Sequence, residues 1–404
     1  MIDALKVIMW VALALLVYAQ VGYGLLLAVL ARVRRAPEQG RAPDHGRAPG
    51  ELRAPDHGPT VVSLIVAAHD EERVMAAKVA NALALDYPRE ALELIVCCDG
   101  CTDRTAELAR EAGADLVLEL PREGKVRAQD EGVERARGEI VAFSDANATL
   151  DRGALRALVG AFADPAVGYA CGQVRFGRSE PSDASPARAR AGGAGADNQE
   201  GLYWRYELAL RSLESRLASI TAGNGALYAT RRAAYLVVDP VMGHDLSFPF
   251  NFVQRGWRAV YVPEALASEK MVPTIEGEFA RKRRMMSHTW PIVLRGGMLR
   301  LHAYRPLYAL MIVSHRLLRY ASPGLHLVAL AANAALLGQG TVYVVVFALQ
   351  LLLLIAAGLA RAFPLRPLLV ARYYVLTTAS AAAGLWDWAR RGTPAGWEAA
   401  EGTR

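Results

Sequence analysis

The chain has 404 residues, of which 53% are hydrophobic, and it carries 46 Lys and Arg against 40 Asp and Glu. Its long apolar runs exclude an entirely water-soluble protein. The positive balance does not indicate nucleic-acid binding, because the arginines gather beside apolar runs, where they fix orientation and meet anionic lipids. Cys97, Cys98, Cys101 and Cys171 have no partner cluster, so we expect buried free thiols rather than a metal site.

The N-terminal region combines an apolar segment with a polar repeat. Residues 7–31 form one uncharged apolar run that is long enough to cross a bilayer as a helix. A signal peptide is the alternative, but the run is long for one, and the basic residues follow it. We predict a transmembrane anchor over 1–34 with its carboxyl end in the cytoplasm. Residues 35–59 repeat an Arg-Ala-Pro hexamer, which predicts a disordered linker.

The rest of the chain divides into a globular part and a second membrane-like part. Residues 60–300 have globular composition, and residues 301–320 predict an amphipathic helix at the cytoplasmic interface. Three apolar runs within 321–390 can each span a bilayer. By apolar length the tail, residues 391–404, then lies outside, although its first arginine favours the cytoplasm. We predict a multi-pass protein of a bacterial-type inner membrane with a cytoplasmic globular domain.

Short apolar strands alternate with helical segments in the first half of the globular part. Strands are expected at 61–68, 92–98, 114–120, 139–145 and 167–176. Helices are expected from 70 to about 85, from about 102, from about 125 to 136, and from 151 to 162. This alternation predicts an α/β fold whose mostly parallel, Rossmann-like sheet is covered on both faces. The polar residues that end successive strands should therefore converge on one crevice.

Residues 141–147 carry the most informative motif. An apolar strand ends at Asp145, and Asn147 follows two positions later, so both side chains point the same way. Hard oxygen ligands just past the carboxyl end of a parallel strand suit Mg²⁺ or Mn²⁺ and, through the ion, a diphosphate. For an isolated pair of this kind, an ordinary loop cap is the alternative.

Six short motifs follow one another in a recognisable order. They are HDEE at 69–72, DGCTD at 99–103, GK at 124–125, SDAN at 144–147, GHDL at 243–246 and RKRR at 281–284. This order resembles membrane-bound family 2 glycosyltransferases with a GT-A fold, most closely the branch of chitin-oligosaccharide, poly-N-acetylglucosamine and hyaluronan synthases. The resemblance covers residues 60 to about 390, including the trailing apolar helices.

The resemblance assigns the donor pocket to residues at the strand ends. Glu71 would contact the uracil and ribose, and Asp99 would hydrogen-bond the nucleotide base. Lys125 follows a glycine at a helix start and would bind pyrophosphate, since a cation beside free helix N–H groups makes an anion site. Asp145 would contact the ribose or the metal ion, and Asn147 the metal ion, where most relatives carry Asp. Helix or turn caps and a solvated lysine remain the alternative roles.

The resemblance also supplies a catalytic base. Asp245 resembles the carboxylate that takes the proton from the acceptor hydroxyl as this attacks the anomeric carbon. A helix N-cap is the alternative role for Asp245. His244 stands where relatives carry an acid, so it could tune Asp245 or add a second titrating group.

The resemblance adds Arg284 to the nucleotide-sugar-binding residues and places further residues on the acceptor side. RKRR occupies the position of the family's QxxRW motif, which sets Arg284 against pyrophosphate or acceptor, with a membrane-proximal basic stripe as the alternative. The missing Gln and Trp of that motif put long-chain processivity in doubt. Trp204, Glu207 and Gly225 look family-like and would line the acceptor side. Residues 178–197 are expected to form a mobile gate or a disordered insert.

The resemblance therefore implies an inverting glycosyltransferase. It would move a sugar from a nucleotide-sugar donor, most simply a UDP-sugar, to a lipid-linked or growing glycan acceptor at the membrane, with Mg²⁺ or Mn²⁺ as cofactor. Two alternatives remain open at this point. One is a glycolipid synthase that adds a single sugar, and the other is an inactive membrane scaffold of the same fold.

Overall fold

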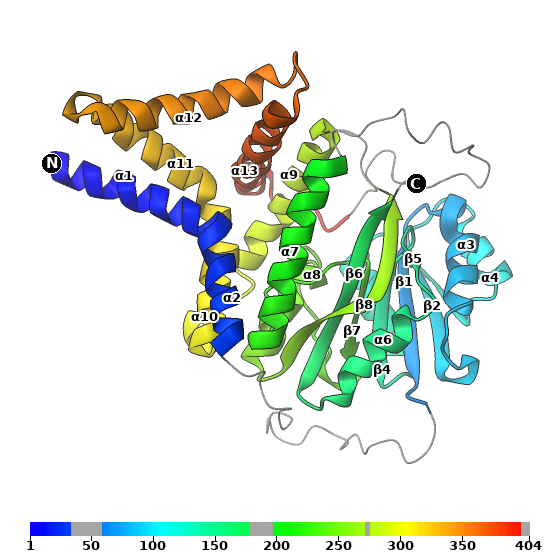
Figure 1. Cartoon of the computed structure of the whole chain (residues 1–404). Helices are drawn as coiled ribbons and strands as arrows, with labels where there is room; N and C mark the ends of the chain where they lie inside the picture. Colours follow the sequence, from blue (N-terminus) through cyan, green and yellow to red (C-terminus); the bar gives the residue numbers. More distant parts are fainter. Residues whose placement is uncertain (34–58, 178–196, 271–274, 397–404) are drawn as a thin grey trace, which may run out of the picture.

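Figure 1 shows the computed structural model of the chain, which describes residues 1–33, 59–177, 197–270 and 275–396. Nearly all of the predicted linker over 35–59 and of the predicted insert over 178–197 lies outside the described residues, as does the tail from residue 397 onward. The described chain forms an α/β domain beside a group of apolar helices (Figure 1).

A mixed sheet of eight strands forms the centre of the domain, in the order β3-β2-β1-β4-β7-β6-β8-β5. The strands are β1 (Val62–Ala68), β2 (Leu92–Asp99), β3 (Leu116–Leu120), β4 (Ile140–Asp145), β5 (Thr149–Leu150), β6 (Val167–Gly177), β7 (Leu227–Arg231) and β8 (Arg258–Lys270). Neighbours among β1 to β4 pair in parallel, as do β6 and β8, whereas β7 and β5 are antiparallel to their neighbours. The predicted α/β fold with a mostly parallel sheet is confirmed.

Helices accompany this sheet, and those between β1 and β6 lie where the sequence predicts four helices. The α-helices of the domain are α3 (Glu72–Leu83), α4 (Thr105–Glu111), α5 (Lys125–Arg135), α6 (Ala154–Gly160), α7 (Asp197–Leu217), α8 (His244–Gln254) and α9 (Ile275–Leu294). Short 3-10 turns are η2 (Arg89–Ala91), η3 (Ala161–Ala163), η4 (Arg232–Ala234), η5 (Leu301–Ala303) and η7 (Leu337–Gln339). All four cysteines are free thiols and three of them are buried, as predicted, while Cys101 is half-buried.

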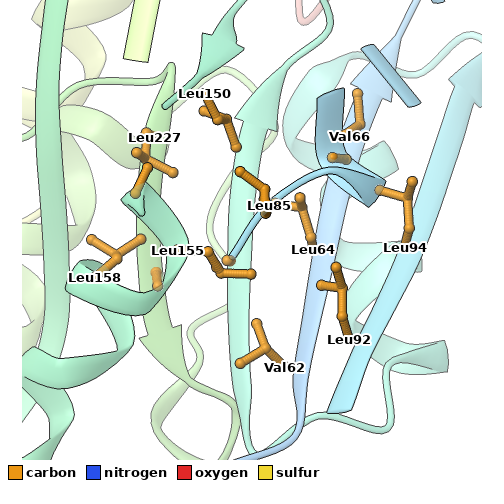
Figure 2. Packing of buried hydrophobic residues seen from close by; sticks show 14 of the residues in the cluster. Val62, Leu64, Val66, Leu85, Leu92, Leu94, Leu150, Leu155, Leu158 and Leu227 are labelled. Atoms are coloured by element: carbon orange, nitrogen blue, oxygen red, sulfur yellow. The ribbon is translucent and has the colours of Figure 1, made fainter. Parts of the chain in front are cut away.

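Strand β1 shows how one apolar run forms two cores, because successive side chains of a strand point to opposite faces. Val62, Leu64 and Val66 pack in a core with buried residues of α3, α4 and α6 (Figure 2). Ile65 and Ala67 pack in a second core with α5 and α8. The sheet is thereby covered on both faces, and its strand ends remain to form a site.

Three helices among the described residues are long and apolar enough to cross a membrane. The first, Ile2–Val33, consists of α1 (Ile2–Val17), the π-helical η1 (Tyr18–Gly22) and α2 (Tyr23–Val33), and it agrees with the predicted anchor. The others are α12 (Thr341–Leu359) and α13 (Arg366–Arg391). Two candidate spans therefore follow the domain, where the sequence predicted about three.

The first predicted C-terminal span is part of a longer helical run. This run consists of α10 (Pro306–Met311), the π-helical η6 (Ile312–Leu317) and α11 (Leu318–Ala335). It also includes most of the predicted interface helix over 301–320. Tyr308 and Met311 pack in a buried cluster with α7, α8 and α9, and Arg319 pairs with Glu207 of α7. Arg319 thus forms an ion pair within the protein, and α11 continues beside α1 (Figure 1).

The chain returns to the α/β domain after α13. The Thr393 hydroxyl donates to the Ser287 carbonyl of α9 at 2.8 Å, and a Cβ built at Gly124 would overlap the carbonyl oxygen of Ala395. Thr393 and Ala395 therefore lie against the domain, and the side of the membrane on which the rest of the tail lies stays a prediction.

Candidate active site

Parallel strands bring three predicted site residues to one edge of the sheet. Glu71 follows β1, Asp99 ends β2 and Asp145 ends β4. Strand β1 lies between β2 and β4 and is parallel to both, so the carboxyl ends of all three strands meet. Open α/β sheets bind their ligands at this edge.

Four of the predicted residues lie together there. Lys125, the first residue of α5, donates a hydrogen bond to Asp145 Oδ1. A Cβ built at Gly225 would lie 3.4 Å from Lys125 Nζ and 3.7 Å from Asp145 Oδ2, so this glycine leaves space beside the ion pair. Asp245 lies in the first turn of α8, and its carbonyl accepts a 2.6 Å hydrogen bond from the N–H of Gly223. That bond ties α8 to the segment that holds Gly225.

Burial and neighbouring charges shift the pKa values of Asp245 and Lys125. Burial raises the pKa of Asp245, which Lys125 lowers by a smaller amount. A general base gains when its pKa moves toward the working pH. Burial opposes the charge of Lys125, but the carboxylates of Asp145, Asp245 and Glu269 together outweigh that penalty, and the pKa of Lys125 is raised. The group therefore combines a stable cation with a carboxylate suited to accept a proton.

Asp99 supports the turn that presents Lys125. Its buried carboxylate accepts hydrogen bonds from the backbone N–H groups of Glu123 and Gly124, at 2.8 and 3.0 Å. Gly124 has φ of 101°, a conformation that favours glycine. Asp99 thus has a structural contact in addition to its predicted contact with the nucleotide base.

The predicted metal ligands come from one turn. Asn147 lies half-buried two residues after Asp145, and Asp145 Oδ2 faces the space left by Gly225. Two hard oxygen ligands in this arrangement fit Mg²⁺ or Mn²⁺. Among the described residues, the one group of three His, Cys, Asp or Glu side chains with metal-like spacing is elsewhere, at His69, Asp70 and Cys101. In that group the His69 ring contacts the guanidinium of Arg122.

The tentative acceptor-side residues separate in the structure. Trp204 packs beside Ala148 and Ala226, which adjoin Asn147 and Gly225, and therefore borders the site. Glu207 is buried elsewhere: it pairs with Arg319, and its Oε2 lies 3.2 Å from Nε2 of His315.

On the donor side, Glu71 is 3% exposed, and its N–H donates to Thr105 Oγ1 at 2.8 Å.

The RKRR segment is mainly a contact between helices. Arg281 forms a bidentate pair with Glu278 of its own helix, and Arg283 forms another with Asp387 of α13. Lys282 donates to the hydroxyl of Tyr373 of α13 at 2.6 Å. Arg284 is exposed. Burial lowers the pKa of His288, the residue one turn further along α9, and the charge of Arg284 adds a smaller shift in the same direction.

His244 does not add a titrating group. Its Nδ1 hydrogen-bonds the hydroxyl of Tyr228 at 2.8 Å, and its ring stacks on Phe248 with centroids 3.9 Å apart. Burial lowers the pKa of His244 to about 3. The imidazole is therefore neutral at ordinary pH and belongs to the aromatic core below Asp245.

Sequence reasoning missed two charged residues beside this group. Lys78 lies on the buried face of α3 with Met75 and Val79, and a lysine on an apolar helical stripe was an available signal. Glu269 of β8 has its pKa raised to about 7 by burial and, next, by the charge of Asp145. No local pattern marks Glu269, because its proximity depends on how β8 pairs with β6.

Comparison with known proteins identifies the family. A family model described as "Glycosyltransferase like family 2" matches residues 59–287, more than half of the chain. The chain belongs to this glycosyltransferase family. The matched region contains Lys125, Asp145, Gly225 and Asp245 as well as the RKRR segment. The predicted family and GT-A fold are confirmed.

This glycosyltransferase is similar to proteins with different printed activities. An N-acetylglucosaminyltransferase of a Rhizobium species is 25% identical over 251 residues, 58% of this chain and 53% of that protein. A beta-monoglucosyldiacylglycerol synthase of a Synechocystis species is 33% identical over 114 residues, 26% of this chain and 24% of that protein. The chain thus spans about half, or less, of the curated relatives that it matches.

A solved structure supports the fold over nearly the full length. A mannosyltransferase from Pyrobaculum calidifontis, in complex with GDP-Man and Mn²⁺, superposes with a TM-score of 0.63 at 22% identity. The alignment covers 95% of this chain and 100% of the other. The α/β domain and the apolar helices of this glycosyltransferase therefore occur together in a known fold.

Proposed function

We propose that this glycosyltransferase inverts the anomeric centre as it moves a sugar from a UDP-sugar to a lipid-linked or growing glycan acceptor. The observation that carries the proposal is the Lys125–Asp145 ion pair near Asp245, with Gly225 next to it, where an added Cβ would be in van der Waals contact with the pair. A cation for the diphosphate and a carboxylate for the acceptor thus border the same space.

The chemistry of the transfer follows from this arrangement. Asp245 takes the proton from the acceptor hydroxyl, whose oxygen forms the new bond to the anomeric carbon. The bond from that carbon to the diphosphate breaks on the opposite side. Lys125 binds the diphosphate and offsets the charge that it gains as it leaves. Glu71 and Asp99 hold the nucleoside at the ends of β1 and β2.

A divalent ion fits the same proposal. Asp145 and Asn147 would hold Mg²⁺ or Mn²⁺, which offsets negative charge on a bound diphosphate. The fit rests on Asp145 Oδ2, which lies beside Gly225, and on the half-buried Asn147 two residues further along the same turn. The mannosyltransferase of the same fold was solved with Mn²⁺ and a nucleotide-sugar, which supports a metal in this one.

The acceptor side faces the apolar helices. Arg284 on α9 and Trp204 on α7 would contact the acceptor, and α9 itself packs on α13, a candidate span. A site next to membrane helices suits an amphipathic acceptor at headgroup level. We propose a bacterial-type inner membrane with the α/β domain in the cytoplasm, where the Arg residues after Val33 and the positive-inside rule place it.

Calorimetry and product analysis test the proposal. The purified full chain in detergent should bind UDP with Mn²⁺ and should transfer sugar from a UDP-sugar to membrane lipid extract. No heat at millimolar UDP argues against a UDP-sugar donor, and binding of GDP instead moves the proposal to a GDP-sugar. A product with one added sugar supports the glycolipid synthase alternative, which the glycolipid-synthase relative favours. Binding without any transfer or donor hydrolysis supports the scaffold.

A further inference from the structure

A lysine of α3 is buried below the turn that carries the proposed metal ligands. We call residues 145–147 the donor turn. Lys78 is 3% exposed, and its Nζ donates to Ser144 Oγ and to the Ala148 carbonyl, each at 2.6 Å. Ser144 precedes the donor turn and Ala148 follows it. One amine therefore ties both ends of the turn together.

A second residue of α3 continues this contact. Asn81 lies three positions after Lys78 and so on the same side of the helix. Its Nδ2 donates to the Leu150 carbonyl at 2.9 Å, and its Oδ1 accepts from the Leu150 N–H at 2.8 Å. Ser144 Oγ also donates to the Ala226 carbonyl at 2.9 Å. The same network therefore reaches the residue next to Gly225, on the other side of the site.

We propose that Lys78 and Asn81 are positioning residues of the donor site: they hold the donor turn in the shape that presents Asp145 and Asn147 to a divalent ion and its diphosphate. This inference rests on the proposed function. It goes beyond that function because both residues act indirectly: Lys78 acts through Ser144 Oγ and the Ala148 carbonyl, and Asn81 acts through the backbone of Leu150.

The amine of Lys78 has two opposing effects on a cation nearby. Its charge would repel the ion, whereas its hydrogen bonds fix the ligands. Burial lowers the pKa of Lys78 to about 7, although Asp145 and Glu269 oppose the shift. At pH 8 the amine is therefore mostly neutral and still has two N–H groups, one for each acceptor. At that pH the hydrogen bonds dominate, so their loss should weaken metal binding.

The test measures the affinity of the full chain for Mn²⁺ and UDP by calorimetry at pH 8. Lys78→Met keeps the length of the side chain and removes both donors. We expect the affinity to fall by about 10- to 100-fold, the effect of losing one or two hydrogen bonds that order the ligands. Asn81→Ala should act in the same direction, and it serves if Lys78→Met does not fold. Val79→Ala is the matched control, because Val79 is equally buried on α3 but packs in the apolar core.

Hydrogen exchange of the ligand-free chain gives a second readout. Amides of residues 145–150 should exchange faster in Lys78→Met and Asn81→Ala, and at the wild-type rate in Val79→Ala. If the affinity for Mn²⁺ and UDP is unchanged or raised in both Lys78→Met and Asn81→Ala, the inference is overturned. The contribution of Lys78 would then be limited to charge repulsion or to core packing. A wild-type chain that binds no nucleotide overturns the proposed function instead, and the exchange rates still decide whether α3 holds the turn.

Discussion

Replacing Lys125 by methionine should affect stability, donor binding and the pH profile together. The side chains of Lys125 and Asp145 are each 25% exposed. Breaking a fully buried pair costs about 3–5 kcal/mol and an exposed one about 0–1 kcal/mol, so we expect a loss of about 2 kcal/mol in the free energy of unfolding. Losing the cation should also weaken UDP binding by about one to two decades, which corresponds to one charge-assisted hydrogen bond.

The pH profile isolates the electrostatic part of this prediction. Asp245 acts as a base only when ionised, so transfer falls as the pH drops through its pKa. Lys125 lowers that pKa, and in Lys125→Met the pKa should therefore rise and the acidic limb of kcat should move to higher pH. Arg127→Met on the same helix is the control, since Arg127 pairs with Glu131 at the surface. An acidic limb that stays in place or moves to lower pH refutes the coupling between Lys125 and the base.

Three further changes test the rest of the site. Asp245→Asn should lower transfer by about 10²–10⁴-fold while calorimetry shows normal UDP binding, and near-normal turnover would exclude Asp245 as the base. Gly225→Ala should fold, because its Cβ would lie at ordinary contact distance from Lys125. It should lose about tenfold in UDP affinity, because the methyl group would occupy space that the ligand needs. Equal UDP affinity in the wild type and in Gly225→Ala would contradict a ligand site beside Gly225. A chelator should abolish transfer, and Asn147→Asp should keep or raise Mn²⁺ affinity; full activity in excess chelator argues against the metal.

The strand ends could be predicted because they depend on local patterns. Apolar runs of strand length end at Asp99 and Asp145, and parallel order places such ends at one edge of the sheet. The helix that starts at Lys125 was equally visible, since a glycine precedes it. These signals placed the donor side of the site within a few residues.

The remaining features depend on contacts between distant segments. Gly225 enters the site because β7 inserts antiparallel between β4 and β6, a direction that a buried strand does not reveal in its sequence. His244 looked like a titrating group by its position in a motif, but the aromatic residues around it keep it neutral. Glu207 looked family-like, and its ion pair with Arg319 could be found only after α7 and α11 were placed.

The contact between the tail and Gly124 makes the membrane topology a question of parity. A chain that leaves the domain after α9 and returns to it at Ala395 must cross the bilayer an even number of times in between. If the candidate spans α12 and α13 both cross the bilayer, a single further crossing by α11 is therefore excluded. A reporter protein fused after Arg404 would consequently lie in the compartment that holds Asp245, and it would identify the side of the membrane from which the donor sugar is drawn.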